Sequence, residues 1–187
     1  MSWRSLGPVV LSVLGVTPLL ARAAAAQAPA GKHVAVPMIP PRPADVASVD
    51  GIIRAFYEVI SGPAGQPRQW ARDRSLYIPG VKFVATRVGK RGPYAAIMDH
   101  QTFVDDADSG MVHEGFFERE VHRVTHTYGS VVHAFSTYEE RRVAHGPVVG
   151  RGINSIELFW DGTRWWIASA VWFDEDAQHP IPTEYLP

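Results

Sequence analysis

The 187-residue sequence contains no cysteine. This absence excludes disulfide bonds, thiolate metal sites and cysteine nucleophiles. It leaves the cellular compartment open, because secreted and periplasmic proteins can also do without disulfides. The sequence also lacks a glycine-rich phosphate loop, a nucleophile elbow and a helical His-Glu-x-x-His motif. The common signatures of nucleotide-binding proteins, serine hydrolases and zinc proteases are therefore missing, and no motif implies a cofactor.

An excess of charge of either sign is missing as well. The 18 basic and 19 acidic residues give a net charge of −1, so the sequence predicts neither a nucleic-acid-binding surface nor an acidic tail. Hydrophobic residues make up 46% of the chain and charged residues 20%. This balance is typical of one soluble domain with a hydrophobic core.

The first residues have the pattern of a secretory signal peptide. Arg4 supplies a positive charge, residues 6–20 are mostly apolar, and small residues fill 23–28. The apolar stretch is shorter than the roughly 20 residues of a membrane-spanning helix, and prolines interrupt it. We therefore expect a signal peptide over residues 1–26 rather than an uncleaved anchor. The mature protein would then be secreted or periplasmic and free of the membrane.

The proline-rich residues 27–44 are predicted to form an extended linker, because proline removes backbone donors and fixes φ. Residues 45–187 are then predicted to form a single domain with a short C-terminal tail. Its clearest element is a helix from residue 49 to residue 60, because the apolar side chains recur at helical spacing along one face. Two shorter helices are predicted over residues 67–76 and 99–107.

Six strands are predicted from alternating apolar patterns: residues 81–88, 94–98, 116–126, 131–142, 153–160 and 165–173. The last two flank Asp161-Gly162, a strong hairpin signal, because glycine accepts the positive φ that the turn needs. Helices gathered on one side of a curved antiparallel sheet make an α+β fold. A strongly bent sheet over the first helix would leave a cavity between the two.

This order of elements is accompanied by FSTYE at 135–139, RGINSIELFWDG at 151–162 and RWWIASAVW at 164–172. Together they resemble the nuclear transport factor 2-like (NTF2-like) superfamily, nearest to its bacterial SnoaL-like branch. The resemblance implies an NTF2-like cone: a strongly curved antiparallel sheet wrapped over a long N-terminal helix, with two shorter helices. The superfamily includes isomerases, dehydratases, cyclases and binding modules, so the fold alone implies no activity.

In the ketosteroid isomerases of this superfamily, a helix tyrosine and a protonated aspartate form an oxyanion hole, and a second aspartate moves the proton. Tyr57 matches the helix tyrosine. One aspartate position falls near Ile156 and the other near Phe83 or Val84, and all three of these side chains are hydrocarbon. We therefore exclude steroid isomerase chemistry. The dehydratase-like members use histidines, which cannot be matched residue by residue to the strand histidines of this chain.

Six residues are predicted to line the cavity. Tyr57 belongs to the first helix, and the other five come from the strands: Phe83, His133, Phe135, Asn154 and Ile156. Tyr57 and His133 are the catalytic candidates, since a buried imidazole can act as an acid or base near neutral pH. The Asn154 amide would orient a carbonyl or hydroxyl group. A purely structural role remains open for each of the three. All these assignments depend on register, because a slip of one residue inverts the two faces of a strand.

Two other groups of polar residues are predicted to lie away from the cavity. Glu118 and Glu120 alternate against Phe117 and Val121, which places both acids on the outer face. His122 and His126 lie four residues apart on one strand, about 13 Å at the usual rise, which is too far to share an ion. No metal site is predicted.

Three functions remain open. The first is a module that binds a small apolar ligand in the cavity. The second is a cofactor-free isomerase, dehydratase or cyclase that uses acid–base chemistry on a carbonyl compound. The third is a non-catalytic structural or dimerisation module. Tryptophans on the convex face of a sheet are seldom left to water, so we also expect a homodimer through that face.

Overall fold

The computed structural model describes residues 33–187, so the predicted signal peptide (1–26) and residues 27–32 of the predicted linker lie outside the described residues. The described chain is an α+β domain. Its helices are α1 (Pro43–Val46), α2 (Val49–Ile60), α3 (Trp70–Arg74), α4 (His100–Glu114) and the 3-10 helix η1 (Thr183–Tyr185). Its strands are β1 (Tyr77–Gly89), β2 (Gly92–Met98), β3 (Phe117–Tyr128), β4 (Val131–Arg141), β5 (Gly150–Trp160) and β6 (Trp165–Asp174). Within residues 33–187, no helix combines the length and hydrophobicity needed to cross a membrane.

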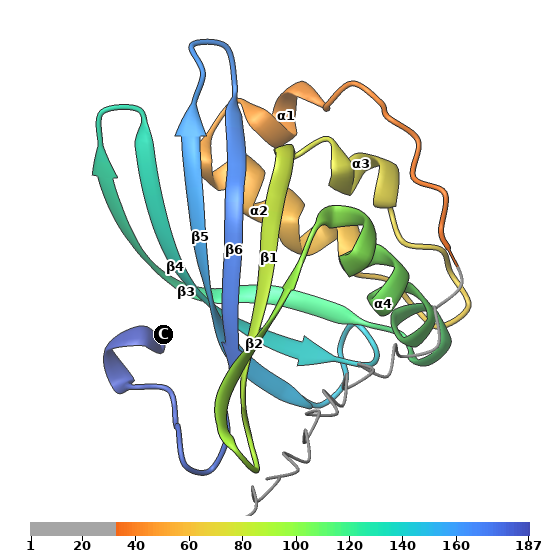
Figure 1. Cartoon of the computed structure of the whole chain (residues 1–187), viewed down its shortest axis with the longest axis vertical. Helices are drawn as coiled ribbons and strands as arrows, with labels where there is room; N and C mark the ends of the chain where they lie inside the picture. The colour runs from red at the N-terminus through yellow and green to blue at the C-terminus, as the bar shows by residue number, and fades with distance from the viewer. Residues whose placement is uncertain (1–32) are drawn as a thin grey trace, which may run out of the picture. The chain divides into compact units, whose positions relative to one another are not determined.

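The six strands form one curved, open sheet in the order β2-β1-β6-β5-β4-β3. Figure 1 shows the strong bend of β3, β4 and β5. Neighbouring strands are antiparallel except β1 and β6, which are parallel. The prediction of an all-antiparallel sheet was therefore wrong at this pair. Alternation within a strand reveals its two faces, but it does not reveal which distant strand will lie beside it.

Local signals explain the helices well. The predicted helix of residues 49–60 is α2, and the Ser48 hydroxyl caps it by accepting from the Gly51 N–H at 3.0 Å. The α3 helix is shorter than predicted. The α4 helix is longer, because it continues through a polar second half to Glu114. Its first turn is capped by the Asp99 carboxylate, which accepts from the Thr102 N–H at 2.8 Å.

The hydrophobic core lies between the helices and the inner face of the sheet. From α2, the side chains of Ile52, Ile53 and Val59 are almost fully buried, and Phe83 and Ile156 face them from the sheet. The α2 helix contacts β3 and β6, and α4 contacts β1 and β2. We call the covered side of the sheet the inner face and the opposite side the outer face.

The C-terminal residues 175–187 lie on the outer face, away from the helices (Figure 1). Thr137 donates its hydroxyl proton to the Tyr185 carbonyl at 2.6 Å, and the rings of Phe135 and Tyr185 meet edge to face. Ile181 is only 9% exposed. The chain thus covers part of its own outer face. At the other end, the Val34 N–H donates to Asp105 of α4 at 2.9 Å, which fixes the last part of the predicted linker.

Candidate functional site

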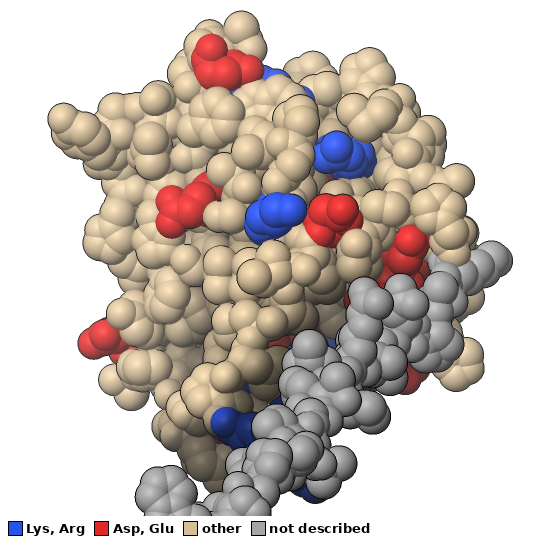
Figure 2. Space-filling view, in the orientation of Figure 1, with Lys and Arg blue, Asp and Glu red and all other residues tan. Residues whose placement is uncertain are grey.

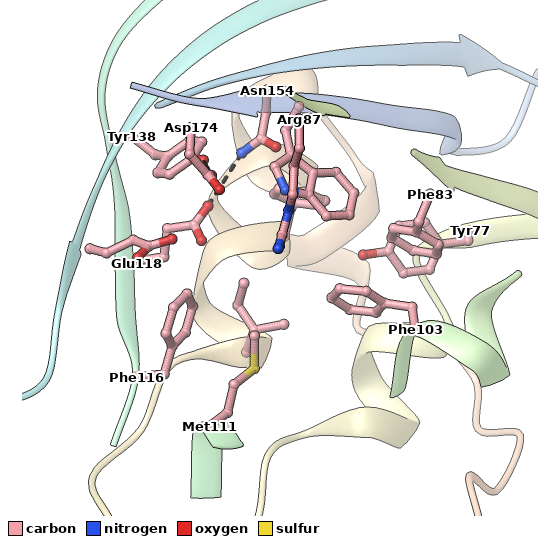
Figure 3. Close-up of a pocket in the computed structure, with 14 residues that line it drawn as sticks. Tyr77, Phe83, Arg87, Phe103, Met111, Phe116, Glu118, Tyr138, Asn154 and Asp174 are labelled. Carbon is pink, nitrogen blue, oxygen red and sulfur yellow. Dashed lines mark hydrogen bonds between the residues drawn. The ribbon is translucent and has the colours of Figure 1, made fainter. Parts of the chain in front are cut away.

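A cavity of about 170 Å³ lies between α2, α4 and the inner face of the sheet (Figure 3). Eight of the side chains that line it are hydrophobic or aromatic: Phe56, Ile60, Tyr77, Phe83, Phe103, Met111, Phe116 and Trp172. Six are polar or charged: Arg87, Glu118, Tyr138, Glu140, Asn154 and Asp174. The volume suits a molecule with a single ring, because an apolar cavity of about 150 Å³ admits benzene.

The apolar wall consists of aromatic rings that hold one another in place. The rings of Phe83 and Phe103 stack with centroids 4.7 Å apart, and Phe103 meets Trp172 edge to face at 6.2 Å. These contacts join β1, α4 and β6 around the cavity. Offset and edge-to-face pairs are the favoured aromatic geometries, so these contacts stabilise the shape of the wall.

Asn154 organises the polar end of the cavity. The side chain is 3% exposed, and its Nδ2 group donates to Tyr57 Oη and to Glu118 Oε1, both at 3.2 Å. The Tyr57 hydroxyl is also 2.6 Å from Ser136 Oγ, and Ser136 donates to Glu120 Oε2. A hydrogen-bond chain therefore links α2 to three strands of the sheet.

The direction of these hydrogen bonds determines whether Tyr57 can donate a proton to a ligand. A hydroxyl has a single proton, and that of Ser136 goes to Glu120, so Tyr57 donates to Ser136 and accepts from Asn154. Burial, and then the nearby Glu118, raise the pKa of Tyr57 well above its usual value. Tyr57 has no proton left for a ligand. It positions the Asn154 amide instead.

Three carboxyl groups meet at the same end. Figure 3 shows Glu118 of β3 and Asp174 of β6, and Glu140 of β4 also lines the cavity. Burial raises the pKa of Glu118 to about 8; the charge of Glu140 adds to this, and the Asn154 hydrogen bond opposes it. Burial, and then the charge of Asp174, raise the pKa of Glu140. At neutral pH the Glu118 carboxyl is therefore largely protonated, since burial disfavours its charged form.

Tyr138 reaches this cluster only because a glycine lies in its path. Its hydroxyl donates to Asp174 Oδ1 at 2.5 Å. A Cβ atom at Gly152 would collide with the Tyr138 hydroxyl and with the Phe173 carbonyl, so a larger residue would block the contact between β4 and β6. No three His, Asp or Glu side chains of residues 33–187 are arranged to hold a metal ion.

The structure brings together only some of the residues that the sequence predicted to line the cavity. Tyr57 and Asn154 bond to each other, and Phe83 lines the cavity. Ile156 lies on the same face but is fully buried in the core, outside the cavity lining.

The prediction that His133 and Phe135 point inward was wrong. The inward residues of β4 are the even-numbered ones, such as Ser136, which bonds to Tyr57. His133 lies on the outer face, 3.0 Å from Ser155 Oγ, and stacks on His126 at 6.0 Å. Phe135 packs against the C-terminal tail. An apolar side chain on a strand indicates a covered face, and for Phe135 the C-terminal tail on the outer face provides that cover.

The prediction for Glu118 and Glu120 was also wrong, because both face inward. Glu118 and Glu120 pair with Glu140 and Tyr138, whose side chains also face inward. The register shifts only after them, between Glu120 and His122, so Val121 lies in a bulge and does not indicate the face of the two acids. Glu140 and Asp174 were missed altogether. The alternation of Ser136, Tyr138 and Glu140 along one strand was the available signal, since three polar residues then share a face.

No model of a known protein family matches the sequence, and no curated protein matches it closely enough to identify a relative. The class of the protein is therefore defined by its fold and its cavity: an α+β domain with a curved mixed sheet and an aromatic pocket that ends in carboxyl groups.

Proposed function

We propose that the chain is an NTF2-like domain of the SnoaL-like branch that binds a small, largely apolar molecule in the cavity. The sequence resemblance supports the family, together with a curved sheet that carries its helices on one face. The observation that carries the function is the cavity itself. Ligand sites are typically apolar clefts with a few polar groups that fix orientation, and this cavity has eight hydrophobic or aromatic lining residues and a polar end.

Filling the cavity tests this proposal. Met111 lines the cavity from α4, so Met111→Trp places a larger side chain in the space that a ligand would occupy. Met38 is 75% exposed and lies outside the cavity lining, so Met38→Trp is the matched control. We expect single-ring compounds to show saturation-transfer NMR signals with the native protein and with Met38→Trp, but not with Met111→Trp. Absence of binding to the native protein, or equal binding to all three, would overturn the proposal.

A second candidate function is the cofactor-free isomerase, dehydratase or cyclase. The observation that favours it is the carboxyl group of Glu118, whose pKa of about 8 suits proton transfer near neutral pH at the end of an apolar cavity. Glu118 takes the role first assigned to Tyr57 and His133, since Tyr57 has no free proton and His133 lies on the outer face. The test is deuterium exchange at the carbon next to the carbonyl of phenylacetone, and loss of exchange in Glu118→Gln is the supporting result.

The remaining proposals concern location and assembly. Secretion or export to the periplasm rests on residues 1–26 and is tested by the mass of the mature protein.

A homodimer through the outer face rests on the aromatic residues there. The C-terminal tail covers Phe135, whereas Trp166 stays partly exposed, with Arg164 over its ring at 3.6 Å. Light scattering tests the dimer. Charge does not oppose association, because acidic and basic groups are scattered over the face in Figure 2.

A further inference from the structure

We infer that the ligand of this cavity carries a protonated amine, which binds at the end formed by Glu118, Glu140, Asn154 and Asp174. The inference rests on the proposed function and names the class of ligand: a single aromatic ring with a short alkylammonium group. Three observations carry it, namely the unpaired oxygen of Asn154, the excess of acceptors over donors in the cavity, and the aromatic wall beside them.

The Asn154 carbonyl oxygen is an acceptor of the cavity lining that has no donor among the described residues. Both hydrogen bonds of its side chain are made by Nδ2, to Tyr57 and to Glu118, and Oδ1 receives none from residues 33–187. In this orientation the amide donates to the Tyr57 hydroxyl, whose own proton goes to Ser136, and to one oxygen of the Glu118 carboxyl group. Such an acceptor in the lining of a largely apolar cavity gains most from a ligand that donates a hydrogen bond.

The other polar groups of the cavity are also mostly acceptors. Glu118 uses one carboxyl oxygen for Asn154, and no described side chain donates to the Glu140 carboxylate. The one donor of Tyr138 is spent on Asp174. An ammonium group supplies up to three N–H donors and a positive charge, and such charge-assisted hydrogen bonds are about twice as strong as neutral ones.

The surroundings favour a cation over a neutral or negative group. The carboxyl groups of Glu118, Glu140 and Asp174 repel one another when charged, and a bound cation relieves that repulsion. The faces of nearby rings, such as Trp172, attract cations as well. Arg87 is the one basic residue of the cavity lining, and it forms no ion pair with any described residue. Its guanidinium opposes an amine, so its removal should tighten binding.

Calorimetry at pH 7 with four probes of similar shape tests the inference: 2-phenylethylamine, 2-phenylethanol, 3-phenylpropionate and ethylbenzene. We expect the amine to bind at least tenfold more tightly than the alcohol, and the carboxylate to bind most weakly. The NMR signal of the Trp172 indole shows whether each probe enters the cavity.

Four variants identify the groups responsible. Glu118→Gln keeps an acceptor for Asn154 but cannot become a carboxylate beside the bound ammonium group, and it should reduce the preference for amine over alcohol several-fold. Glu140→Gln repeats the test on β4 in case Glu118→Gln does not fold. Glu157→Gln removes a carboxylate from the outer face of β5 and should leave the preference unchanged. Arg87→Gln should raise the affinity for the amine several-fold.

The outcomes separate this inference from the proposed function. Equal affinity for the amine and the alcohol, or tightest binding of the carboxylate, overturns the amine and leaves small-molecule binding intact. A preference for the amine that survives both Glu118→Gln and Glu140→Gln overturns the assigned site. Binding of none of the four probes overturns the proposed function and the inference together.

Discussion

At the scale of single residues, Asn154 connects the fold to the chemistry of the cavity. Its amide holds Tyr57 of α2 on one side and the Glu118 carboxyl group of β3 on the other. Tyr57, which looked catalytic in the sequence, supports this amide. Glu118 is the cavity acid whose pKa rises to about 8, and the groups that act on it, Glu140, Asn154 and Asp174, come from β4, β5 and β6.

Replacement of Asn154 by leucine should raise the pKa of Glu118 further. The Asn154 hydrogen bond lowers that pKa and partly offsets burial, and leucine fills a similar volume without a donor. The measurement is a carbon-detected NMR titration of the Glu118 carboxyl group in both proteins. An unchanged or lower pKa in Asn154→Leu would show that the hydrogen bond does not act on Glu118.

A second buried acid lies behind the aromatic wall. Asp73 is fully buried and accepts from the Tyr77 hydroxyl at 2.7 Å, with His100 Nε2 2.8 Å from its other oxygen. Asp73→Ala would leave both partners unsatisfied, so we expect a loss of about 3–5 kcal/mol in the free energy of unfolding.

Urea denaturation measures this loss, and two variants calibrate it. Tyr77→Phe removes only one donor and should cost about 1–2 kcal/mol. Asp106→Ala changes an exposed acid on α4 and should stay within about 0.5 kcal/mol of the native protein. If Asp73→Ala costs no more than Asp106→Ala, the buried hydrogen bonds are not a source of stability.

At the scale of the elements, the packing of α1 against α2 depends on a glycine. A Cβ atom at Gly51 would lie 2.5 Å from the Ala44 carbonyl oxygen, which is backbone and cannot move aside alone. Gly110 in α4 has open space around its Cβ position and is exposed. Both glycines are helical, so propensity alone favours alanine by about 1 kcal/mol at either position.

The two substitutions should therefore have opposite signs. We expect Gly110→Ala to stabilise the domain by about 0.5–1 kcal/mol, and Gly51→Ala to destabilise it, because the collision outweighs the gain in propensity. Thermal unfolding of the two variants gives the comparison. Stabilisation by both substitutions would mean that α1 moves away from α2 without cost.

The elements themselves were largely predictable from the sequence, and their arrangement was not. The α2 helix and the β5–β6 hairpin follow from a helical apolar stripe and an Asp-Gly turn, which are local signals. The parallel pair of β1 and β6 depends on strands about 90 residues apart. The bulge at Val121 has no signature in an alternating pattern.

The same contrast explains the success and failure of the site prediction. Asn154 was placed correctly because β5 alternates without interruption up to that point. His133 was misplaced because Phe135, its neighbour on the same face, is covered by the C-terminal tail and not by α2. The acidic cluster was missed because its members come from β3, β4 and β6, and only the tertiary fold brings them together.

At the scale of the whole molecule, the acidic cavity contributes to the pH dependence of stability. The folded state raises the pKa of Glu118 to about 8, from a usual value of 4.5, so the folded protein holds this proton more tightly than the unfolded chain. The stabilisation is complete below about pH 4.5 and is lost as the pH rises through about 8. The raised pKa of Glu140 acts in the same direction.

Glutamine at position 118 cannot titrate, so the contribution of Glu118 appears as the difference between two proteins. We expect the native protein to lose, relative to Glu118→Gln, on the order of 3 kcal/mol in the free energy of unfolding between pH 4.5 and pH 8.5. Urea denaturation at several pH values measures the difference, and titrations elsewhere in the chain cancel. A saturating amine should reverse the trend, because a cation in the cavity stabilises the charged carboxylates that otherwise destabilise the fold. A parallel pH dependence of the two proteins would show that Glu118 is not the buried acid of the cavity.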